Sequence, residues 1–329
     1  MENIKENNKK KLVAIFSNDS DFTTNDVYNW IEYLGNDCII IKDINKQSTK
    51  IKIVIDKENI TLTINDKTLS SIWFRKYWET IPIWLNDKIS NYISFHIEQE
   101  IKVFNSALMI IAVESIKNII GSNFILKGEM DVNKQHLLYL AAKCGLNIPS
   151  TIISNCKDDI IRFLENYKKV IIKPLSDPAS LIVDNNNIYT TYTEIISEKD
   201  IKNLPNMIFP CFLQEYIEKE FEIRIFYLRN KIYSSAIFSQ LFEQTHIDFR
   251  KYIKDKEHRI VPFQLPKSIE MSIRKLMKVV GLNTGSIDMI YTQKGDYVFL
   301  EVNPVGQFGM ISEPCNYYLE KKVAEELIC

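Results

Sequence analysis

The sequence predicts a mixed α/β or α+β fold in three units. Strand-like and helix-like segments alternate along the whole chain, a pattern that indicates layered sheets and helices and not a helical bundle or a β-sandwich. With 329 residues, 46% of them hydrophobic, the chain is long and apolar enough for two or three domains. We expect an N-terminal α/β domain at 1–120, a small central α+β unit at 121–205 and a C-terminal antiparallel-sheet α+β unit at 206–329.

In the first unit, apolar runs and alternating segments predict strands, and helical spacing predicts two helices. Val27, Ile31 and Leu34 recur at the period of a helix, whereas residues 59–64 alternate between apolar and polar side chains. The expected strands are 11–17, 38–41, 50–55, 59–64 and 71–75, and the expected helices are 26–34 and 89–119.

The second and third units open with an amphipathic helix and close with a hairpin. The helix at 133–144 is ended by Gly145 and Pro149. A later helix is closed by Gly281. The remaining expected elements are strands at 150–154, 170–173, 212–217, 221–228 and 231–238, and helices starting near Asp158 and spanning 269–280.

Charge and composition exclude several classes of partner. The 41 Lys+Arg residues balance 42 Asp+Glu residues, so no basic surface indicates nucleic acid. The longest apolar stretch, 107–113, is too short to cross a membrane, and the polar N-terminus has no signal-peptide core. We therefore expect a cytoplasmic protein with no membrane or nucleic-acid partner. Its six cysteines include no Cys-x-x-Cys pair and are expected to be free thiols.

Two carboxylates and a carboxamide converge in the predicted hairpin near the C-terminus. Asp288 precedes the turn sequence at 294–296, and Glu301 and Asn303 follow it. Glu301 and Asn303 are two positions apart, so their side chains leave the same face of a strand. Three hard oxygen ligands suit Mg²⁺ held beside the phosphates of a nucleotide. The alternative is a solvated strand face that ends at Pro304.

Six features in order along the chain resemble the ATP-grasp superfamily, over residues 121 to 310. The ordered set and its spacings carry this resemblance, and no single motif does. It implies ATP and Mg²⁺ as cofactors, with Mg²⁺ held by the three hairpin residues. The features are Lys134, Lys173, Gln214-Glu215-Tyr216-Ile217, Glu222-Ile223-Arg224, Asp288 and Glu301-x-Asn303.

The resemblance implies that Lys134 and Lys173 contact the phosphates of ATP. An ammonium at a helix start offsets phosphate charge, although a solvated lysine is the alternative for Lys134. Lys173 ends an apolar strand where an unpaired charge is costly, so we expect it to point into a ligand site. The implied adenine-binding hinge consists of Gln214, Glu215, Tyr216 and Ile217.

Glu222 and two arginines complete the implied nucleotide site. Glu222 matches the acid that binds the ribose hydroxyls, and the alternative is an exposed carboxylate paired with Lys219 or Arg224. Arg224 and Arg250 resemble the arginines that brace the transferred phosphate and the acyl phosphate, since a planar guanidinium matches phosphate oxygens. An exposed salt-bridge arginine is the alternative for each.

The loop after Lys173 departs from the pattern of the family. Many members cover the phosphates with a glycine-rich loop, whereas residues 174–180 read PLSDPAS and contain no glycine. The loop therefore lacks the glycines that let a backbone approach phosphate closely. The hydroxyls of Ser176 and Ser180 are candidates to replace it.

Shorter motifs resemble the peptide maturases of the graspetide synthetase type, including microviridin-type and grasp-with-spasm enzymes. The resemblance implies an ATP-dependent ligase that phosphorylates Asp or Glu side chains of a ribosomal precursor peptide. A Ser or Thr hydroxyl or a Lys amine then attacks, giving an ω-ester or ω-amide macrocycle. The implied partner is the leader and core of the precursor, and a homodimer is possible. The motifs are 71–76, 145–151, 248–252 and 259–262.

Two alternatives stay open beside this hypothesis. A ligase that joins free amino acids or extends a protein tail would use the same ATP site, although the maturase motifs argue against it. A nucleotide-binding scaffold without catalysis belongs to a different class, and the complete set of metal-ligand positions argues against it. Residues that are candidates for leader binding, with core packing as the alternative, are Trp73, Tyr77, Trp78, Trp84, Phe242 and Glu243.

Overall fold

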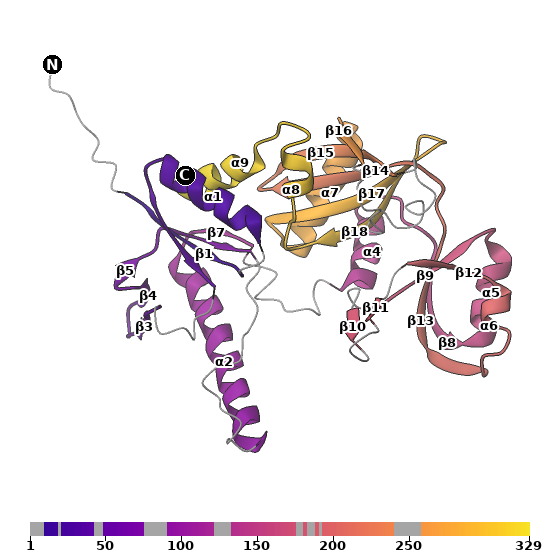
Figure 1. Ribbon diagram of the computed structural model, residues 1–329, viewed down its shortest axis with the longest axis horizontal. Helices are drawn as coiled ribbons and strands as arrows, with labels where there is room; N and C mark the ends of the chain where they lie inside the picture. The colour runs from indigo at the N-terminus through magenta and orange to yellow at the C-terminus, as the bar shows by residue number, and fades with distance from the viewer. Residues whose placement is uncertain are drawn as a thin grey trace.

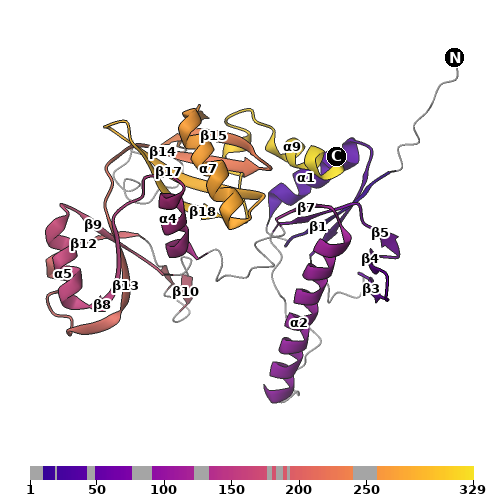
Figure 2. The same ribbon diagram turned by 180° about the vertical axis from the view of Figure 1, so that it is seen from behind.

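The structure is a computed structural model in which the chain forms three lobes in a row (Figure 1). The N-terminal lobe contains a parallel sheet, the C-terminal lobe a five-stranded antiparallel sheet, and the small lobe a four-stranded antiparallel sheet. The C-terminal lobe lies in the middle of the row, and the view from behind shows the same order (Figure 2). The described residues are 10–18, 21–42, 49–75, 91–121, 133–175, 180–182, 188–190, 193–239 and 258–329.

The N-terminal lobe is built on four parallel strands, which confirms the α/β architecture expected at this end of the chain. Their order is β2-β1-β6-β7, with β1 at Leu12–Phe16, β2 at Asp37–Ile41, β6 at Ser71–Phe74 and β7 at Asn118–Ile120. β1 is buried along its whole length, as is usual for a parallel strand with both faces covered. The other elements are α1 (Phe22–Tyr33), α2 (Asn91–Ser115), and the antiparallel strands β3 (Ile51–Ile55), β4 (Ile60–Ile64) and β5 (Lys67–Thr68).

Two helix boundaries in this lobe differ from the sequence prediction. α1 starts four residues early, at Phe22, because the carboxylate of Asp21 caps it by accepting the backbone N–H of Thr23. The helix expected at 89–119 ends at Ser115. The residues after it form β7, since the β-branched pair Ile119-Ile120 completes the edge of the sheet beside β6.

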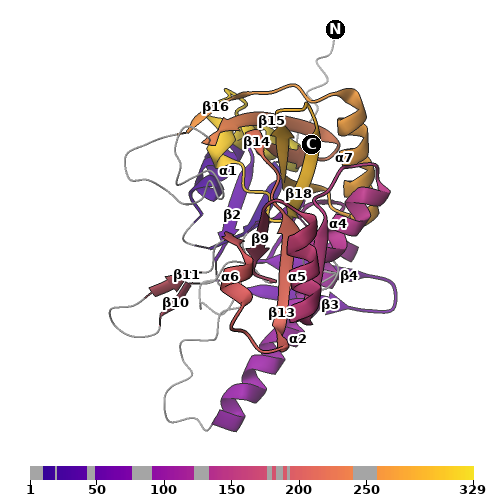
Figure 3. The same ribbon diagram turned by 90° about the vertical axis from the view of Figure 1, so that its right-hand side faces the viewer.

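The small lobe is an antiparallel sheet with helices on one face. Its strands, in the order β12-β9-β13-β8, are β8 (Thr151–Cys156), β9 (Val170–Lys173), β12 (Glu194–Ile196) and β13 (Met207–Glu215). Helices α5 (Lys157–Asn166) and α6 (Glu198–Ile201) cover the outer face, where Ile160, Val170, Ile201 and Leu213 form a core (Figure 3). The other face of this sheet lies toward the C-terminal lobe. A separate strand pair consists of β10 (Ser180–Ile182) and β11 (Ile188–Thr190).

The C-terminal lobe contains the hairpin that the sequence predicted. Its sheet has the order β16-β15-β14-β17-β18, with β14 at Lys219–Leu228, β15 at Lys231–Phe238, β16 at Arg259–Pro262, β17 at Thr284–Thr292 and β18 at Tyr297–Asn303. β17 and β18 are antiparallel and are joined by a short turn, which confirms the hairpin. Helices α4 (Lys134–Lys143) and α7 (Lys267–Val280) pack on one face of the sheet in a shared core. Two further helices, α8 (Gly309–Ser312) and α9 (Leu319–Ile328), follow β18.

The N-terminal and C-terminal lobes share one hydrophobic core. Helix α9 lies beside α1, and side chains from both helices pack with β1, β14 and Phe308 (Figure 2). Polar contacts cross the same boundary, where Asn283 donates to the backbone carbonyl of Ile119 at 2.7 Å. The backbone N–H of Gly121 donates in return to the side chain of Asn283 at 2.9 Å. These two lobes therefore hold one another in a fixed arrangement.

Candidate active site

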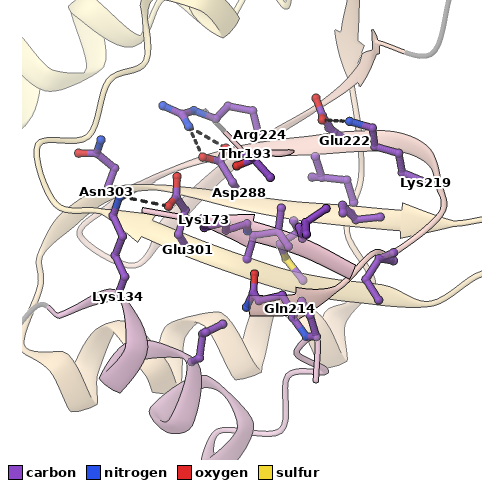
Figure 4. A pocket seen from close by; sticks show the side chains of 18 of the residues that line it. Lys134, Lys173, Thr193, Gln214, Lys219, Glu222, Arg224, Asp288, Glu301 and Asn303 are labelled. Atoms are coloured by element: carbon purple, nitrogen blue, oxygen red, sulfur yellow. Dashed lines mark hydrogen bonds and ion pairs between the residues drawn. The ribbon is translucent and has the colours of Figure 1, made fainter. Parts of the chain in front are cut away.

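A cavity of about 390 Å³ is lined by residues of the small and C-terminal lobes (Figure 4). All candidate nucleotide-binding, catalytic and metal-binding residues of the sequence analysis that fall in the described part of the chain line it. Arg250 lies outside the described residues, so the structure does not place it. The candidates that line the cavity are Lys134, Lys173, Gln214, Glu215, Tyr216, Ile217, Glu222, Arg224, Asp288, Glu301 and Asn303.

The alternation of β14 determines which of its side chains reach the cavity. Glu222 and Arg224 are two positions apart and leave the same face of the sheet. The side chains of Ile223 and Ile225 are buried in the core beneath α7, although Ile223 also forms part of the cavity lining. The strand is central in the sheet and covered on both faces, so its polar residues are buried as well.

Arg224 forms a buried ion pair with Asp288 at the centre of the cavity. The two residues are opposite each other on β14 and β17, and one guanidinium nitrogen lies 2.7 Å from each carboxylate oxygen. The Nε atom of Arg224 is buried and has no hydrogen-bond partner among the described residues. A buried donor without a partner is rare in proteins. The unpaired Nε atom therefore favours a ligand whose oxygens can accept a hydrogen bond from it.

The three hairpin oxygens predicted to hold a cation lie on one face of β17 and β18. Asp288 is directly opposite Glu301, and Ser286 is opposite Asn303, with a bulge after Asp288. The ammonium of Lys134, at the first residue of α4, lies 3.6 Å from Glu301. The side-chain oxygen of Asn303 accepts the backbone N–H of Val305 at 3.1 Å. One end of the cavity thus combines oxygen ligands with a lysine ammonium (Figure 4).

This oxygen set fits Mg²⁺ better than a softer metal ion. Among the described residues no group of three His, Cys, Asp or Glu side chains lies close enough to hold a metal. The hairpin offers two carboxylates and one carboxamide instead, which are hard donors. Mg²⁺ usually takes only one or two protein carboxylates and completes its shell with water and phosphate oxygens. The chemistry of the donors therefore suits a Mg²⁺ ion bound together with a polyphosphate.

The other end of the cavity contains a second buried pair, Lys219 and Glu222. Their side chains are joined by a hydrogen bond, and Glu222 is only 9% exposed. Burial raises the pKa of Glu222, and the ammonium of Lys219 opposes that rise. The alternative from the sequence, a Glu222–Lys219 pair, is present, but it is buried in the cavity wall and not exposed.

The small lobe supplies the opposite wall of the cavity through β9 and β13. Lys173 and Phe212 are register partners and leave the sheet on the cavity side. Gln214 is buried, and its side-chain amide donates to Thr151 at 3.0 Å. The backbone N–H of Tyr216 donates to the carbonyl of Lys169 at 2.9 Å. The segment after β13 is therefore held at both the side chain and the main chain where it meets the cavity.

Several lining residues were not predicted from the sequence. Leu138 lies one helical turn after Lys134 on α4, so the helical period was a signal for it. Gln307 and Met310 come from the segment after Asn303, and Thr193 precedes β12. No sequence pattern pointed to these three. The remaining unpredicted lining residues are Pro149, Ile171, Pro174, Phe212, Lys219, Ile223, Ile237, Met289, Ile290 and Leu300.

Some candidates of the sequence analysis fall outside this cavity or outside the described residues. Trp73 is 2% exposed and stacks on Phe308, so it is a core residue, as the alternative held. The side chains of Ser176 and Ser180 are not among those described. Leader-binding candidates that lie outside the described residues are Tyr77, Trp78, Trp84, Phe242 and Glu243.

Solved structures of ATP-grasp ligases share this architecture over nearly the whole chain. The macrocyclase MdnC from Microcystis aeruginosa MRC, bound with precursor peptide MdnA, is 25% identical with a TM-score of 0.78, covering 96% of this chain and 99% of that one. A RiPP-associated ATP-grasp ligase from Chryseobacterium gregarium, in complex with ADP and a leader and core peptide, is 22% identical with a TM-score of 0.81, covering 96% of each chain.

A third similar structure is the ATP-grasp ligase PsnB, complexed with minimal precursor, Mg and ADP. It is 17% identical with a TM-score of 0.74, and the match covers 96% of each chain. No protein-family model and no curated protein matches the sequence. The predicted ATP-grasp fold is confirmed, and so is the resemblance to peptide maturases of this fold. No helix in the described part of the chain is long and apolar enough to span a membrane.

Proposed function

We propose that this chain is an ADP-forming ATP-grasp ligase that closes macrocycles in a ribosomal precursor peptide. It activates Asp or Glu side chains of the peptide and joins them to Ser, Thr or Lys side chains as ω-esters or ω-amides. One observation carries the proposal: the cavity gathers cations and hairpin carboxylates between two sheets, in a fold that ligases bound to precursor peptides share.

The charge distribution in the cavity supports a nucleotide polyphosphate as one ligand. Lys134, Lys173 and Arg224 line its length, together with the carboxylates of Asp288 and Glu301. A polyphosphate with its Mg²⁺ ion needs this mixture of cations and oxygen ligands. We assign the triphosphate to the end of the cavity that contains Lys134 and Glu301, and the base and ribose to the end that contains Tyr216 and Glu222.

Each proposed role, apart from that of Arg250, is assigned to a residue that lines the cavity. Lys134 and Lys173 bind phosphate oxygens, and Glu222 accepts the ribose hydroxyls. Arg224 braces the transferred phosphate, a role that fits its unpaired buried Nε atom. Arg250 keeps its predicted role beside the acyl phosphate. The adenine contacts are assigned to Gln214, Glu215, Tyr216 and Ile217, and the Mg²⁺ ligands are Asp288, Glu301 and Asn303.

The proposed reaction solves the problem that a carboxylate is a poor electrophile. A carboxylate oxygen of the peptide attacks the γ-phosphorus of ATP, the bond to the bridging oxygen breaks, and ADP leaves. The hydroxyl or amine then attacks the carbonyl of the acyl phosphate, loses its proton, and phosphate leaves. When bound, Mg²⁺ neutralises the charge that develops on the phosphates. Arg224 and the two lysines position the reacting oxygens, so no nucleophile of the enzyme is required.

The peptide partner is supported by the neighbours, whose structures contain precursor, leader or core peptides. Because a ribosomal precursor is made in the cytoplasm, we place the reaction there. The division into units at residues 120 and 205 is kept as part of the proposal, as is a homodimer.

Formation of an acyl phosphate on the peptide distinguishes this proposal from the two alternatives, a ligase of free amino acids and a scaffold without catalysis. Hydroxylamine added to enzyme, MgATP and precursor peptide should convert activated Asp or Glu side chains to hydroxamates, detected by mass spectrometry of the peptide. A ligase of free amino acids would give a hydroxamate of the amino acid and leave the peptide unchanged. A scaffold would give neither product and no ADP.

A further inference from the structure

Arg75 is a buried arginine of the N-terminal lobe that the proposed reaction does not use. Its side chain is 2% exposed and forms an ion pair with Asp21, whose carboxylate oxygen lies 2.8 Å from Nε. Asp21 also caps α1, and the hydroxyl of Thr23 accepts a hydrogen bond from Arg75 at 3.1 Å. The guanidinium lies over the rings of Trp73 and Phe308, 5.3 and 5.2 Å from their centroids. Packing and charge thus fix its position.

The remaining donors of Arg75 reach the segment that follows Asn303. One guanidinium nitrogen donates to the backbone carbonyl of Val305 at 2.7 Å and to that of Gly306 at 2.6 Å. Gly306 has a φ of +67°, a conformation that other residues rarely adopt. A Cβ atom there would lie 3.2 Å from the hydroxyl of Thr284. The backbone at residues 305 and 306 is therefore restricted to one conformation.

The same segment is held from the cavity side by C-terminal lobe residues. The carbonyl of Gln307 accepts the hydroxyl of Ser286 at 2.6 Å and a guanidinium nitrogen of Arg224 at 3.3 Å. Three successive carbonyls, at 305, 306 and 307, thus accept hydrogen bonds from two buried arginines. Charge-assisted hydrogen bonds are about twice as strong as neutral ones, so this segment has little freedom to shift.

The segment in turn orients Asn303. Its side-chain oxygen accepts the N–H of Val305, the residue whose carbonyl Arg75 holds. An amide oxygen has two lone pairs, so one remains for a metal ion when the other accepts this hydrogen bond. Groups that bond to a metal ligand in this way set its direction and tune affinity. A chain of contacts therefore runs from Asp21 through Arg75 and Val305 to the carboxamide of Asn303.

We propose that Arg75 is a positioning residue that sets the carboxamide of Asn303 for the divalent cation, so that the N-terminal lobe controls metal binding in the cavity. The inference rests on the proposed Mg²⁺ role of Asn303. It also assigns a function to Arg75 within the motif at 71–76, whose described residues 71–74 are buried in the core. The Asp21–Arg75 pair acts through the backbone carbonyls of Val305 and Gly306, and neither member of the pair lines the cavity.

The test compares Arg75→Lys with Arg229→Lys in the full-length protein. Arg229 also links the two lobes, through the side chain of Asn118 and the carboxylate of Glu326, but it does not line the cavity. Calorimetry measures ADP binding at increasing Mg²⁺, and hydrogen exchange reports the backbone N–H groups of residues 303–308 other than Pro304. For Arg75→Lys we expect the half-saturating Mg²⁺ concentration to rise about tenfold or more, as for other groups behind a metal ligand. Exchange at 303–308 should also quicken.

Both readouts should stay at the wild-type value in Arg229→Lys. Asp21→Asn keeps an oxygen that can cap α1 but removes the charge that pairs with Arg75. It should raise the Mg²⁺ midpoint and quicken exchange at 303–308, as Arg75→Lys does, and it serves as the test variant if Arg75→Lys fails to fold. An unchanged Mg²⁺ midpoint in folded Arg75→Lys, or an equal shift in Arg229→Lys, overturns the inference and leaves the proposed function standing. If ADP binding by the wild-type protein does not depend on Mg²⁺, that result counts against the proposed function. The exchange measurement still tests the inference in that case, because unchanged exchange at 303–308 in Arg75→Lys would overturn it.

Discussion

Arg224 and Asp288 lie opposite each other on β14 and β17, and one guanidinium nitrogen is 2.7 Å from both carboxylate oxygens. The residue proposed to brace the transferred phosphate and the residue proposed to bind the cation are thus one buried pair. Each fixes the other at the centre of the cavity. Their side chains are only 8% and 17% exposed, so the pair is weakly screened by water and salt.

Removing one member of this pair should destabilise the protein strongly. Arg224→Met leaves the carboxylate of Asp288 buried without its partner, and we expect the free energy of unfolding to fall by about 3 to 5 kcal/mol. Urea denaturation measures this change. The matched control is Lys10→Met, which breaks the exposed pair with Asp37 and should cost less than about 1 kcal/mol. Equal losses in the two variants would show that the Arg224 pair is not buried as described.

Glu222 should determine the preference of the enzyme for a ribose with both hydroxyls. A hydrogen bond to a charged group is worth about 1.5 to 3 kcal/mol, so wild-type protein should bind ATP about 10 to 100 times tighter than 2′,3′-dideoxy-ATP. Glu222→Gln should bind the two nucleotides alike in a calorimetric titration. Glu220→Gln, an exposed change on the same strand, should keep the preference. A preference that survives in Glu222→Gln would remove Glu222 from the ribose site.

Gly121 should tolerate no side chain, because of the backbone that faces it. It has a φ of +85°, and a Cβ atom would lie 2.4 Å from the carbonyl oxygen of Phe74. Gly35 has a similar φ of +83° but nothing within 4 Å of the same position. Gly35→Ala should cost about 1 to 2 kcal/mol for the left-handed conformation alone, and Gly121→Ala should cost about 1 to 3 kcal/mol more for the steric clash. Thermal unfolding of the two variants measures the difference, and equal costs would contradict the described contact.

The cysteines should differ in reactivity according to their burial. All six are free thiols, as the sequence predicted. Burial, with a smaller effect of Glu32, raises the pKa of Cys38 to about 12, so its thiol stays protonated at pH 8. Iodoacetamide at that pH should modify the exposed Cys329 and leave Cys38 unmodified until urea is added. Peptide mass spectrometry measures both, and equal rates in the folded protein would place Cys38 at the surface.

The sequence was sufficient to predict which side chains share a face of the site. Alternation on one strand put Glu301 and Asn303 on the same face, and the turn between β17 and β18 brought Asp288 opposite Glu301. The helical period predicted the helix at 133–144, and the structure starts α4 one residue later, at Lys134, because the side chain of Asn133 caps it. These signals depend on residues close together in the chain, so one sequence is enough to detect them.

Long-range partners could not be predicted in the same way. Alternation gives the face of Arg224 but not the neighbouring strand, so its pairing with Asp288, 64 residues away, needed the sheet order. The alternative in which Glu222 is an exposed carboxylate is wrong in its exposure, because β14 is a central strand covered on both faces. The bonds from Arg75 to Val305 and Gly306 join segments about 230 residues apart, and no periodicity reports such a contact.

The most direct test of the proposed function is the mass of the precursor peptide after reaction. Wild-type enzyme with Mg²⁺, ATP and its cognate precursor should remove one water, about 18 Da, for each ring, and form one ADP per ring, as expected for acyl transfer through a phosphate. Glu301→Gln should leave the peptide mass unchanged. ADP release by wild-type enzyme without any loss of mass from that peptide would contradict macrocyclisation.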